Sequence, residues 1–227
     1  MNIAVLGNGD VGRTLAGKLS ERGHRVSMGT RDPDSTRGRT SPGMMGGPSV
    51  AEWLGAHPAV DLQTFAAAAA GAQLVIVATS GGQTLAALEA AGEANLNNKV
   101  LLDVTNPLDF SRGMPPTLTV CNDDSLAEQI QRRFPGAMVV KSLNTVNAGL
   151  MVDPGSLADG AHTLFVSGND RAAKAEVVAL LQDDFGWKHV LDLGDITTAR
   201  GTEMFLPLWV RLWGALGSPA FNVQIVR

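Results

Sequence analysis

The chain alternates short apolar runs with stretches of helical pattern. Residues 3–6 and 74–78 are apolar at every position, and further strand-like runs follow at 25–28, 100–104 and 138–140. Apolar runs that do not alternate with polar residues are typical of strands buried on both faces. Strands separated by helices predict βαβ units and therefore an α/β fold with a mostly parallel sheet.

The pattern changes after Ala148. Residues 163–166 and 189–192 are typical of strands, and a helical pattern at 171–183 lies between them. We expect residues 1–148 to form the core and residues 149–227 to continue the same domain. Within the core, helices are predicted at 13–22, which is amphipathic, and at the alanine-rich run 66–70.

The last predicted helix begins near Thr198 and is apolar nearly all round. Its large apolar residues are Met204, Phe205, Leu206, Leu208, Trp209, Leu212 and Trp213. A helix of this kind must be buried, so we expect a homodimer with this helix at the interface. Packing against its own domain is the alternative.

Residues 32–48 interrupt the alternation. The segment is rich in Gly, Pro, Ser, Thr and Arg, a composition that predicts a long loop. Loops of this length in a compact domain usually have a function or move.

Composition and charge exclude several classes of protein. The net charge of −4 over 227 residues gives no reason to bind nucleic acid or an acidic membrane. Residues 204–216, the longest apolar segment, are too few to span a bilayer, and the start of the chain lacks the pattern of a signal peptide, so a cytoplasmic protein is expected. The single cysteine, Cys121, is predicted to be buried.

The sequence also narrows the chemistry. It has no tyrosine, which excludes the Tyr-x-x-x-Lys mechanism of short-chain dehydrogenases. Its four histidines lack metal-ligand spacing, so we expect no metal site and interpret all four as structural or surface residues.

One motif predicts a cofactor. The run Gly7-Asn8-Gly9-Asp10-Val11-Gly12 fits G-x-G-x-x-G, follows a predicted strand and opens a predicted helix. In that context Gly7 permits a tight turn, Gly9 lets a pyrophosphate approach the backbone, and Gly12 lets the helix pack close to the strand. The free N–H groups of the helix then face the phosphates. We therefore predict a Rossmann dinucleotide-binding fold.

The end of the second strand favours NADP(H) over NAD(H). An NAD enzyme usually has an acid there, whereas this chain has Gly29-Thr30-Arg31. A hydroxyl and a guanidinium suit the 2′-phosphate of NADP(H). Arg37 and Arg39 in the following loop either close over the same phosphate or are solvated charges. Asp32 is the complication, because an acid at the strand end would favour NAD(H).

Small polar residues follow three other strands, where parallel sheets bind ligands. The candidates for the nicotinamide side are Thr79, Ser80, Asn106, Pro107, Asn144 and Ala148. Lys141 is the only lysine near this cleft and is either a general acid for a carbonyl or, as we prefer, an ordinary strand-end residue. No other catalytic residue is predicted.

These residues resemble a known family. The glycine motif, Gly29-Thr30-Arg31, residues 141–148 and a late helix with Glu203 and Pro207 are similar to the NADPH-dependent coenzyme F420 reductases. They also resemble the reductase domain of the STEAP metalloreductases. Two features depart from the family, a long loop at 32–48 and a glycine turn one residue shorter, and both concern the second cofactor more than the NADP(H) site.

The resemblance implies a Rossmann protein, usually dimeric, that passes hydride between NADP(H) and a deazaflavin or flavin. It implies that residues 8–11 line the pyrophosphate, that Thr30 and Arg31 hold the 2′-phosphate, and that Thr79, Ser80, Asn106 and Ala148 flank the nicotinamide. Hydride transfer between stacked rings needs no acid from the protein, consistent with the lack of a clear proton donor. Reduction of a small carbonyl or imine and non-catalytic sensing of NADP(H) are the alternatives.

Overall fold

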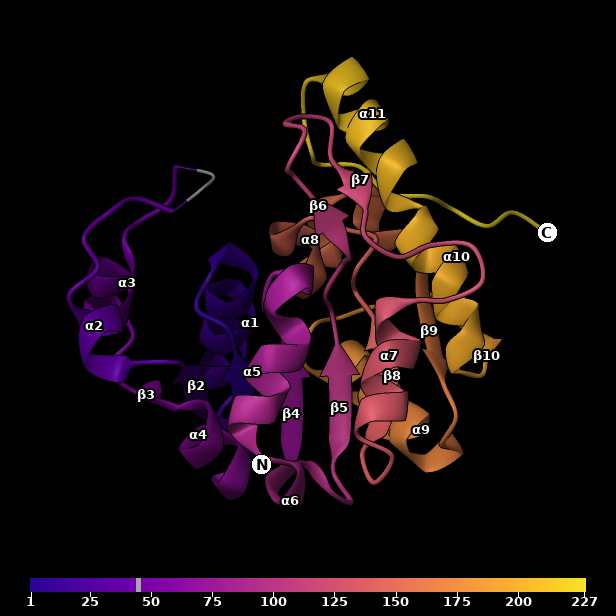
Figure 1. The fold of residues 1–227 in the computed structure, drawn as a ribbon. Coiled ribbons are helices and arrows are strands. Elements are labelled where there is room, and N and C mark those ends of the chain that lie inside the picture. Colours follow the sequence, from indigo (N-terminus) through magenta and orange to yellow (C-terminus); the bar gives the residue numbers. More distant parts are fainter. Residues whose placement is uncertain (44–45) are drawn as a thin grey trace.

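The computed structural model describes residues 1–43 and 46–227, and in this part of the chain eight strands form one sheet between two layers of helices (Figure 1). The strands are β1 (Asn2–Leu6), β2 (Arg25–Thr30), β3 (Asp61–Thr64), β4 (Leu74–Val77), β5 (Val100–Asp103), β8 (Met138–Ser142), β9 (Leu164–Gly168) and β10 (Val190–Gly194). Their order across the sheet is β10-β9-β8-β5-β4-β1-β2-β3. This confirms the predicted Rossmann-type α/β fold.

The direction of the strands positions the site. The strands from β3 to β8 are parallel, whereas β9 runs antiparallel to β8 and β10 runs parallel to β9. The chain proceeds from β1 outward to β2 and β3, then crosses back to β4 on the other side of β1. Ligands of open α/β sheets bind at the carboxyl ends of the strands beside such a reversal.

Each face of the sheet has its own core. The helices of the described residues are α1 (Asp10–Glu21), α2 (Pro33–Arg37), α3 (Val50–Ala56), α4 (Phe65–Gly71), α5 (Thr84–Ala91), α6 (Glu93–Leu96), α7 (Leu126–Arg133), α8 (Ala148–Val152), α9 (Arg171–Asp183), α10 (Ala199–Met204) and α11 (Leu206–Leu216). Leu15 of α1 and Val177 of α9 share one core with Ile3. Leu88 of α5 and Ile130 of α7 share the other with Ala4. Neighbouring residues of β1 thus point into opposite cores, which explains its continuous apolar run.

Two local predictions need correction. The region 32–48 is not loop throughout, because α2 begins directly after Asp32; residues 44–45 of this prediction lie outside the described part of the chain. Asp32 followed by Pro33 is an N-cap signal that would have predicted this helix. Cys121 is exposed, because it precedes α7 on the surface instead of lying in a strand.

The apolar C-terminal helix is divided and poorly covered. It consists of α10 and α11, and α11 rises beyond the carboxyl ends of the parallel strands from β3 to β8 (Figure 1). Leu206 is buried, but Leu208 and Leu216 are 54% and 60% exposed, so this one chain does not cover the helix as an apolar pattern requires. A short hairpin of β6 (Leu108–Asp109) and β7 (Thr117–Leu118) stands beside it (Figure 1). No helix in the described residues is both long and apolar enough to cross a membrane.

Candidate cofactor site

The glycine turn has the geometry that the motif predicts. Gly7 has a φ of 123°, and its N–H donates to the carbonyl of Gly29 at 3.0 Å. A Cβ on Gly12 would collide with the carbonyl oxygen of Gly7, so only glycine lets α1 pack this closely. In contrast, no described atom lies within 4 Å of the place where a Cβ on Gly9 would stand. The turn therefore has open space at the position where a pyrophosphate would approach.

The beginning of α1 faces the same space. Among the described residues no side chain caps this helix at Gly9, which leaves the N–H groups of its first turn for an anion. The carboxylate of Asp10 pairs with Arg13, which is buried and also donates to the carbonyl of Pro48. The Asp10–Arg13 pair thus joins the start of α1 to the segment that precedes α3. Val11 is partly buried against the core below the turn.

Thr30, and not Asp32, occupies the end of β2. The carboxylate of Asp32 accepts from the N–H of Ser35 at 3.0 Å and caps α2. Thr30 is 4% exposed, and its hydroxyl bonds to the Asn8 amide and to the Thr36 hydroxyl, both at 2.9 Å. The residue that would favour NAD(H) is therefore used by the fold, while the buried hydroxyl of Thr30 links the end of β2 to the glycine turn and to α2.

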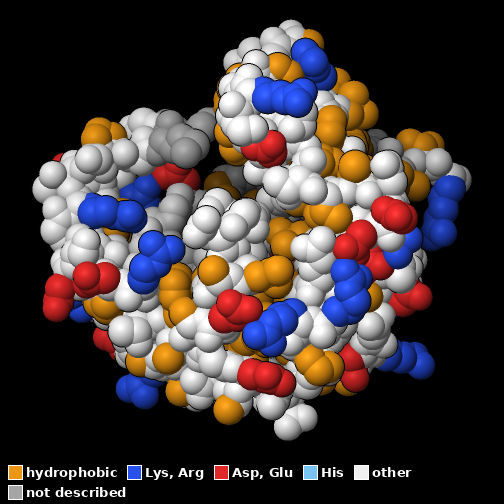
Figure 2. Space-filling model, in the orientation of Figure 1, with side chains coloured by type: hydrophobic (Ala, Val, Ile, Leu, Met, Phe, Trp, Pro, Cys, Tyr) orange, Lys and Arg blue, Asp and Glu red, His pale blue; other side chains and the backbone are white. Residues whose placement is uncertain are grey.

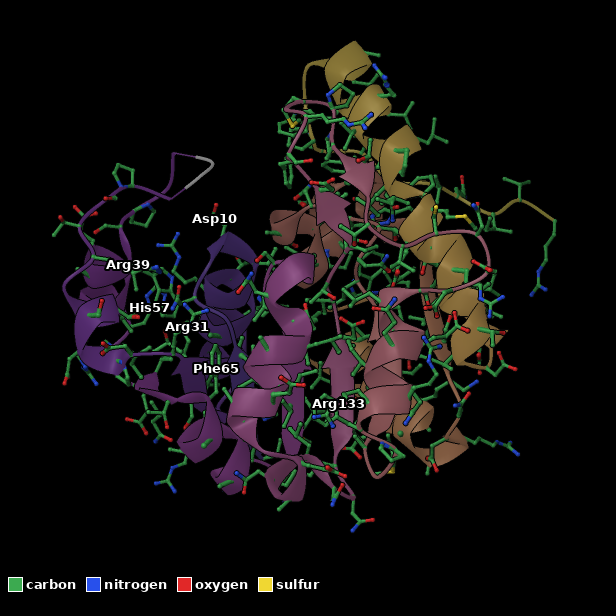
Figure 3. All side chains as sticks on the ribbon, viewed as in Figure 1. Asp10, Arg31, Arg39, His57, Phe65 and Arg133 are labelled. Carbon is green, nitrogen blue, oxygen red and sulfur yellow. The ribbon has the colours of Figure 1, made fainter. Side chains whose placement is uncertain are left out.

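The three predicted arginines have different partners. Arg31 is exposed and donates to Gln83 Oε1 at 3.5 Å, the outer limit of a hydrogen bond. Arg39 donates to Asn8 Oδ1 at 2.6 Å, whereas Arg37 donates to the carbonyl of Leu62 in β3. In Figure 3, Arg31, Arg39 and Asp10 border the space between α1 and the lobe formed by α2 and α3. The side chain that contacts the glycine turn is thus that of Arg39, not Arg37.

The residues predicted for the nicotinamide side also meet. Asn106 and Asn144 bond to each other: Asn106 Nδ2 donates to the Asn144 carbonyl and Asn144 Nδ2 donates to Asn106 Oδ1. Gly81, at the end of the loop after β4, packs against the Asn106 backbone so closely that a Cβ there would clash. The Thr79 hydroxyl bonds to that of Thr84. The loops after β4, β5 and β8 therefore form one connected edge.

The other residues predicted for the nicotinamide side lie along the same edge. Ser80 is exposed, Pro107 is buried, and Ala148 is the partly exposed first residue of α8. Sequence reasoning did not single out Thr145, whose buried hydroxyl has no partner among the described residues. Leu143, two residues before Thr145, has a φ of 63°, a conformation rarely adopted by residues other than glycine. A segment with an unusual backbone and an unpaired hydroxyl therefore lies beside the predicted nicotinamide position.

Lys141 is a structural cross-link. It is 1% exposed, and its ammonium contacts Asp103 Oδ2 at 2.9 Å, Glu203 Oε1 at 2.8 Å and the Thr105 carbonyl at 2.6 Å. Burial alone would lower the pKa of Lys141, but the two carboxylates raise it above its ordinary value. All three N–H donors are used, which fits the preferred interpretation of an ordinary strand-end residue and disfavours a general acid.

Glu203 has a second function in the fold. Its carboxylate accepts from the N–H groups of Leu126 and Ala127 at the beginning of α7. The same side chain thus pairs with Lys141, beside Asp103, and caps a helix that begins 77 residues earlier in the sequence. No group of His, Cys, Asp and Glu in the described residues has the arrangement of a metal site.

The chain is similar in sequence and fold to proteins described as NADP-dependent oxidoreductases. Residues 2–107 match the family described as NADP oxidoreductase, coenzyme F420-dependent. The crystal structure of a candidate F420-dependent NADP-reductase from Arthrobacter sp. FB24 is 60% identical, with a TM-score of 0.95 and full coverage of both chains.

Two more distant proteins are similar to this chain in sequence or in fold. Metalloreductase STEAP3 of Rattus norvegicus is 28% identical over 91% of this chain, which spans only 37% of that protein's length. A reductive aminase from Aspergillus terreus, solved with NADPH, is 17% identical with a TM-score of 0.62, over 95% of this chain and 62% of that one, and supports the fold alone. The chain therefore belongs to the family of coenzyme F420-dependent NADP oxidoreductases and is an NADP-dependent oxidoreductase.

Proposed function

We propose that the protein transfers hydride between NADP(H) and a deazaflavin of the F420 type or a flavin. The observation that carries this proposal is the state of Lys141, the lysine nearest to the predicted nicotinamide position, whose donors are all used in buried pairs. A carbonyl or imine substrate needs a proton donor at the reacting atom. Transfer between two stacked rings needs only that they be held in contact with water excluded. The name of the Arthrobacter protein supports the same acceptor.

In this proposal the residues bind and orient, and they do not exchange protons with the substrate. The turn around Gly9 and the first N–H groups of α1 would hold the pyrophosphate. Arg31 would bind the 2′-phosphate above Thr30, and Thr79, Ser80, Asn106 and Ala148 would fix the nicotinamide face. When bound, NADPH supplies the hydride, and the proton that balances reduction of the acceptor ring comes from solvent.

The direct test mixes purified protein with NADPH and oxidised F420, and follows the near-ultraviolet absorbance of NADPH and the visible absorbance of the deazaflavin. We expect both to fall together, at equal molar rates. FMN, FAD and riboflavin tested in parallel separate a deazaflavin acceptor from a flavin. No spectral change in either cofactor, across a range of pH, would contradict the deazaflavin proposal.

We also propose that the protein is a homodimer and that α11 lies at its interface. The helix exposes Leu208 and Leu216, while Trp209 and Trp213 are only partly buried. Apolar side chains gather on this projecting part of the surface (Figure 2). A two-fold axis would bring the same face of two copies together, which is the common way to cover such a helix.

A further inference from the structure

The polar residues at the end of β2 form one network that reaches the glycine turn. The Asn8 carboxamide donates from Nδ2 to Thr30 Oγ1 at 2.9 Å and accepts at Oδ1 from Arg39 Nη2 at 2.6 Å. Thr30 Oγ1 in turn bonds to Thr36 Oγ1 at 2.9 Å. Because the two ends of the carboxamide have different partners, a donor and an acceptor, its orientation is fixed.

The backbone of Arg39 is held as firmly as its side chain. Its N–H donates to the Thr36 carbonyl at 3.1 Å, and its carbonyl accepts from the Ala51 N–H, also at 3.1 Å. Arg39 is exposed and lies in a region rich in glycine and proline, yet it is tied to α2, to α3 and to the glycine turn. A residue ordered before a ligand arrives loses little entropy on binding it.

The guanidinium groups of Arg31 and Arg39 thus approach the end of β2 from two different segments of the chain. Arg31 directly follows Thr30, and Arg39 comes from the segment after α2 (Figure 3). Each guanidinium has five N–H donors, and the bonds to Gln83 and Asn8 use one on each. The nearest carboxylate in the sequence, that of Asp32, caps α2.

We propose that Asn8 is a positioning residue that holds Arg39 beside the end of β2, and that Arg39 and Arg31 together bind the 2′-phosphate of NADP(H). The preference for the phosphorylated dinucleotide would then depend on an amide in the pyrophosphate turn as well as on the strand end. Arg37 is assigned no part in this, because its guanidinium is held at the Leu62 carbonyl in β3 and not at the glycine turn. The inference rests on the use of NADP(H) in the proposed function, but not on the identity of the hydride acceptor.

The test is calorimetric titration of the full chain with NADPH, NADH and adenosine 2′,5′-bisphosphate. Loss of one charge-assisted contact lowers affinity roughly 10- to 100-fold. Arg39→Ala should therefore weaken the binding of NADPH and of the bisphosphate by that factor. The affinity for NADH should change by less than about 3-fold, which is within the range of an ordinary surface substitution. Arg37→Ala is the matched control and should leave the NADPH/NADH affinity ratio unchanged.

The positioning by Asn8 is tested by a double-mutant cycle. Asn8→Ala should lower the NADPH/NADH affinity ratio, and adding it to Arg39→Ala should lower that ratio no further, because both changes remove the same contact. Additive effects on the ratio would overturn the assignment to Asn8. The assignment to Arg39 would be overturned if Arg39→Ala lowered the affinities for NADPH and NADH equally. It would also be overturned if Arg37→Ala changed the NADPH/NADH affinity ratio as much as Arg39→Ala does. Absence of turnover with F420 contradicts only the proposed acceptor, since these affinities are measured without it.

Discussion

At the scale of single residues, the three motif glycines are required for different reasons. Gly7 adopts a positive φ, Gly12 has no room for a side chain, and Gly9 has open space around it. The motif therefore combines two positions that the fold needs with one that the ligand needs. The two kinds of requirement are separable by experiment.

Gly12→Ala and Gly9→Ala should have opposite phenotypes. Alanine at position 12 meets the backbone of Gly7, which must shift, so we expect a loss of about 1–3 kcal/mol in the free energy of unfolding. Alanine at position 9 meets no described atom and should leave stability within about 0.5 kcal/mol, but its methyl group occupies the space proposed for the pyrophosphate. Urea denaturation and NADPH titration of both variants give the comparison. The interpretation would be contradicted if the two variants had similar stabilities and similar affinities for NADPH.

At the scale of elements, buried charges connect segments that are distant in sequence. The ammonium of Lys141 at β8 joins Asp103 of β5 to Glu203 of α10. A buried charge left without its partner is strongly destabilising. The cross-link therefore fixes α10 against the carboxyl ends of two central strands.

Lys141→Met should lower the free energy of unfolding by about 3–5 kcal/mol, because two buried carboxylates lose their counter-charge. Lys99→Met is the control: Lys99 bonds only to the carbonyls of Ala69 and Ala70 among the described residues, and its loss should cost less. Turnover per folded molecule should be retained in both variants, whereas a general acid at position 141 would lose most of it. The folded pKa of Lys141 is raised, so its stabilisation should persist to about pH 10.4 and be lost only above it.

The beginning of α7 should confer sensitivity to acid. Arg132 and Gln129 bond to the carboxylate of Asp124 and lower its pKa from 3.8 to about 2. A lowered folded pKa means that the stabilisation is complete above about pH 4 and is lost as the pH falls toward 2. Since the Arg132 side chain is 60% exposed, screening limits the effect to about 1 kcal/mol. Arg132→Gln should remove the larger part of this pH dependence and leave the part due to Gln129, as measured by thermal unfolding between pH 5 and pH 2.

Periodicity predicted the elements with strong local patterns. The strands β1, β4 and β5 and the helix α9 lie where the apolar runs indicated. The strand β3 was missed because its residues, Asp61–Thr64, are mostly polar at the edge of the sheet. At the candidate site, the sequence indicated which residues follow the strands, but it did not indicate the Asn8–Arg39 and Asn106–Asn144 bonds, since these join residues 31 and 38 positions apart. No local pattern encodes such contacts.

At the scale of the whole molecule, the proposed cofactor site and the proposed interface occupy the same side. The carboxyl ends of the parallel strands from β3 to β8, the β6–β7 hairpin and α11 all lie toward one end of the molecule (Figure 1). A notch separates the lobe of α2 and α3 from the projecting α11 (Figure 2). Association through α11 would therefore take place close to the proposed cofactor site.

Leu208→Asp should convert the proposed dimer to a monomer, because it places a charge on the apolar face of α11. Ala90→Asp, on the exposed side of α5, is the control and should leave the mass unchanged. Sedimentation equilibrium or light scattering measures both. A monomer in the unmodified protein would disprove the proposed interface.

The pairing of Lys141 with Glu203 also has a consequence for synthesis of the chain. The lysine leaves the ribosome 62 residues before its second carboxylate, and α7 awaits the same residue for its cap. Until then the ammonium of Lys141 has only Asp103 as a charged partner, and the beginning of α7 lacks the cap from Glu203. A nascent or prematurely terminated chain would therefore hold the cofactor-binding motif in a fold that still lacks the second carboxylate beside Lys141 and this cap of α7.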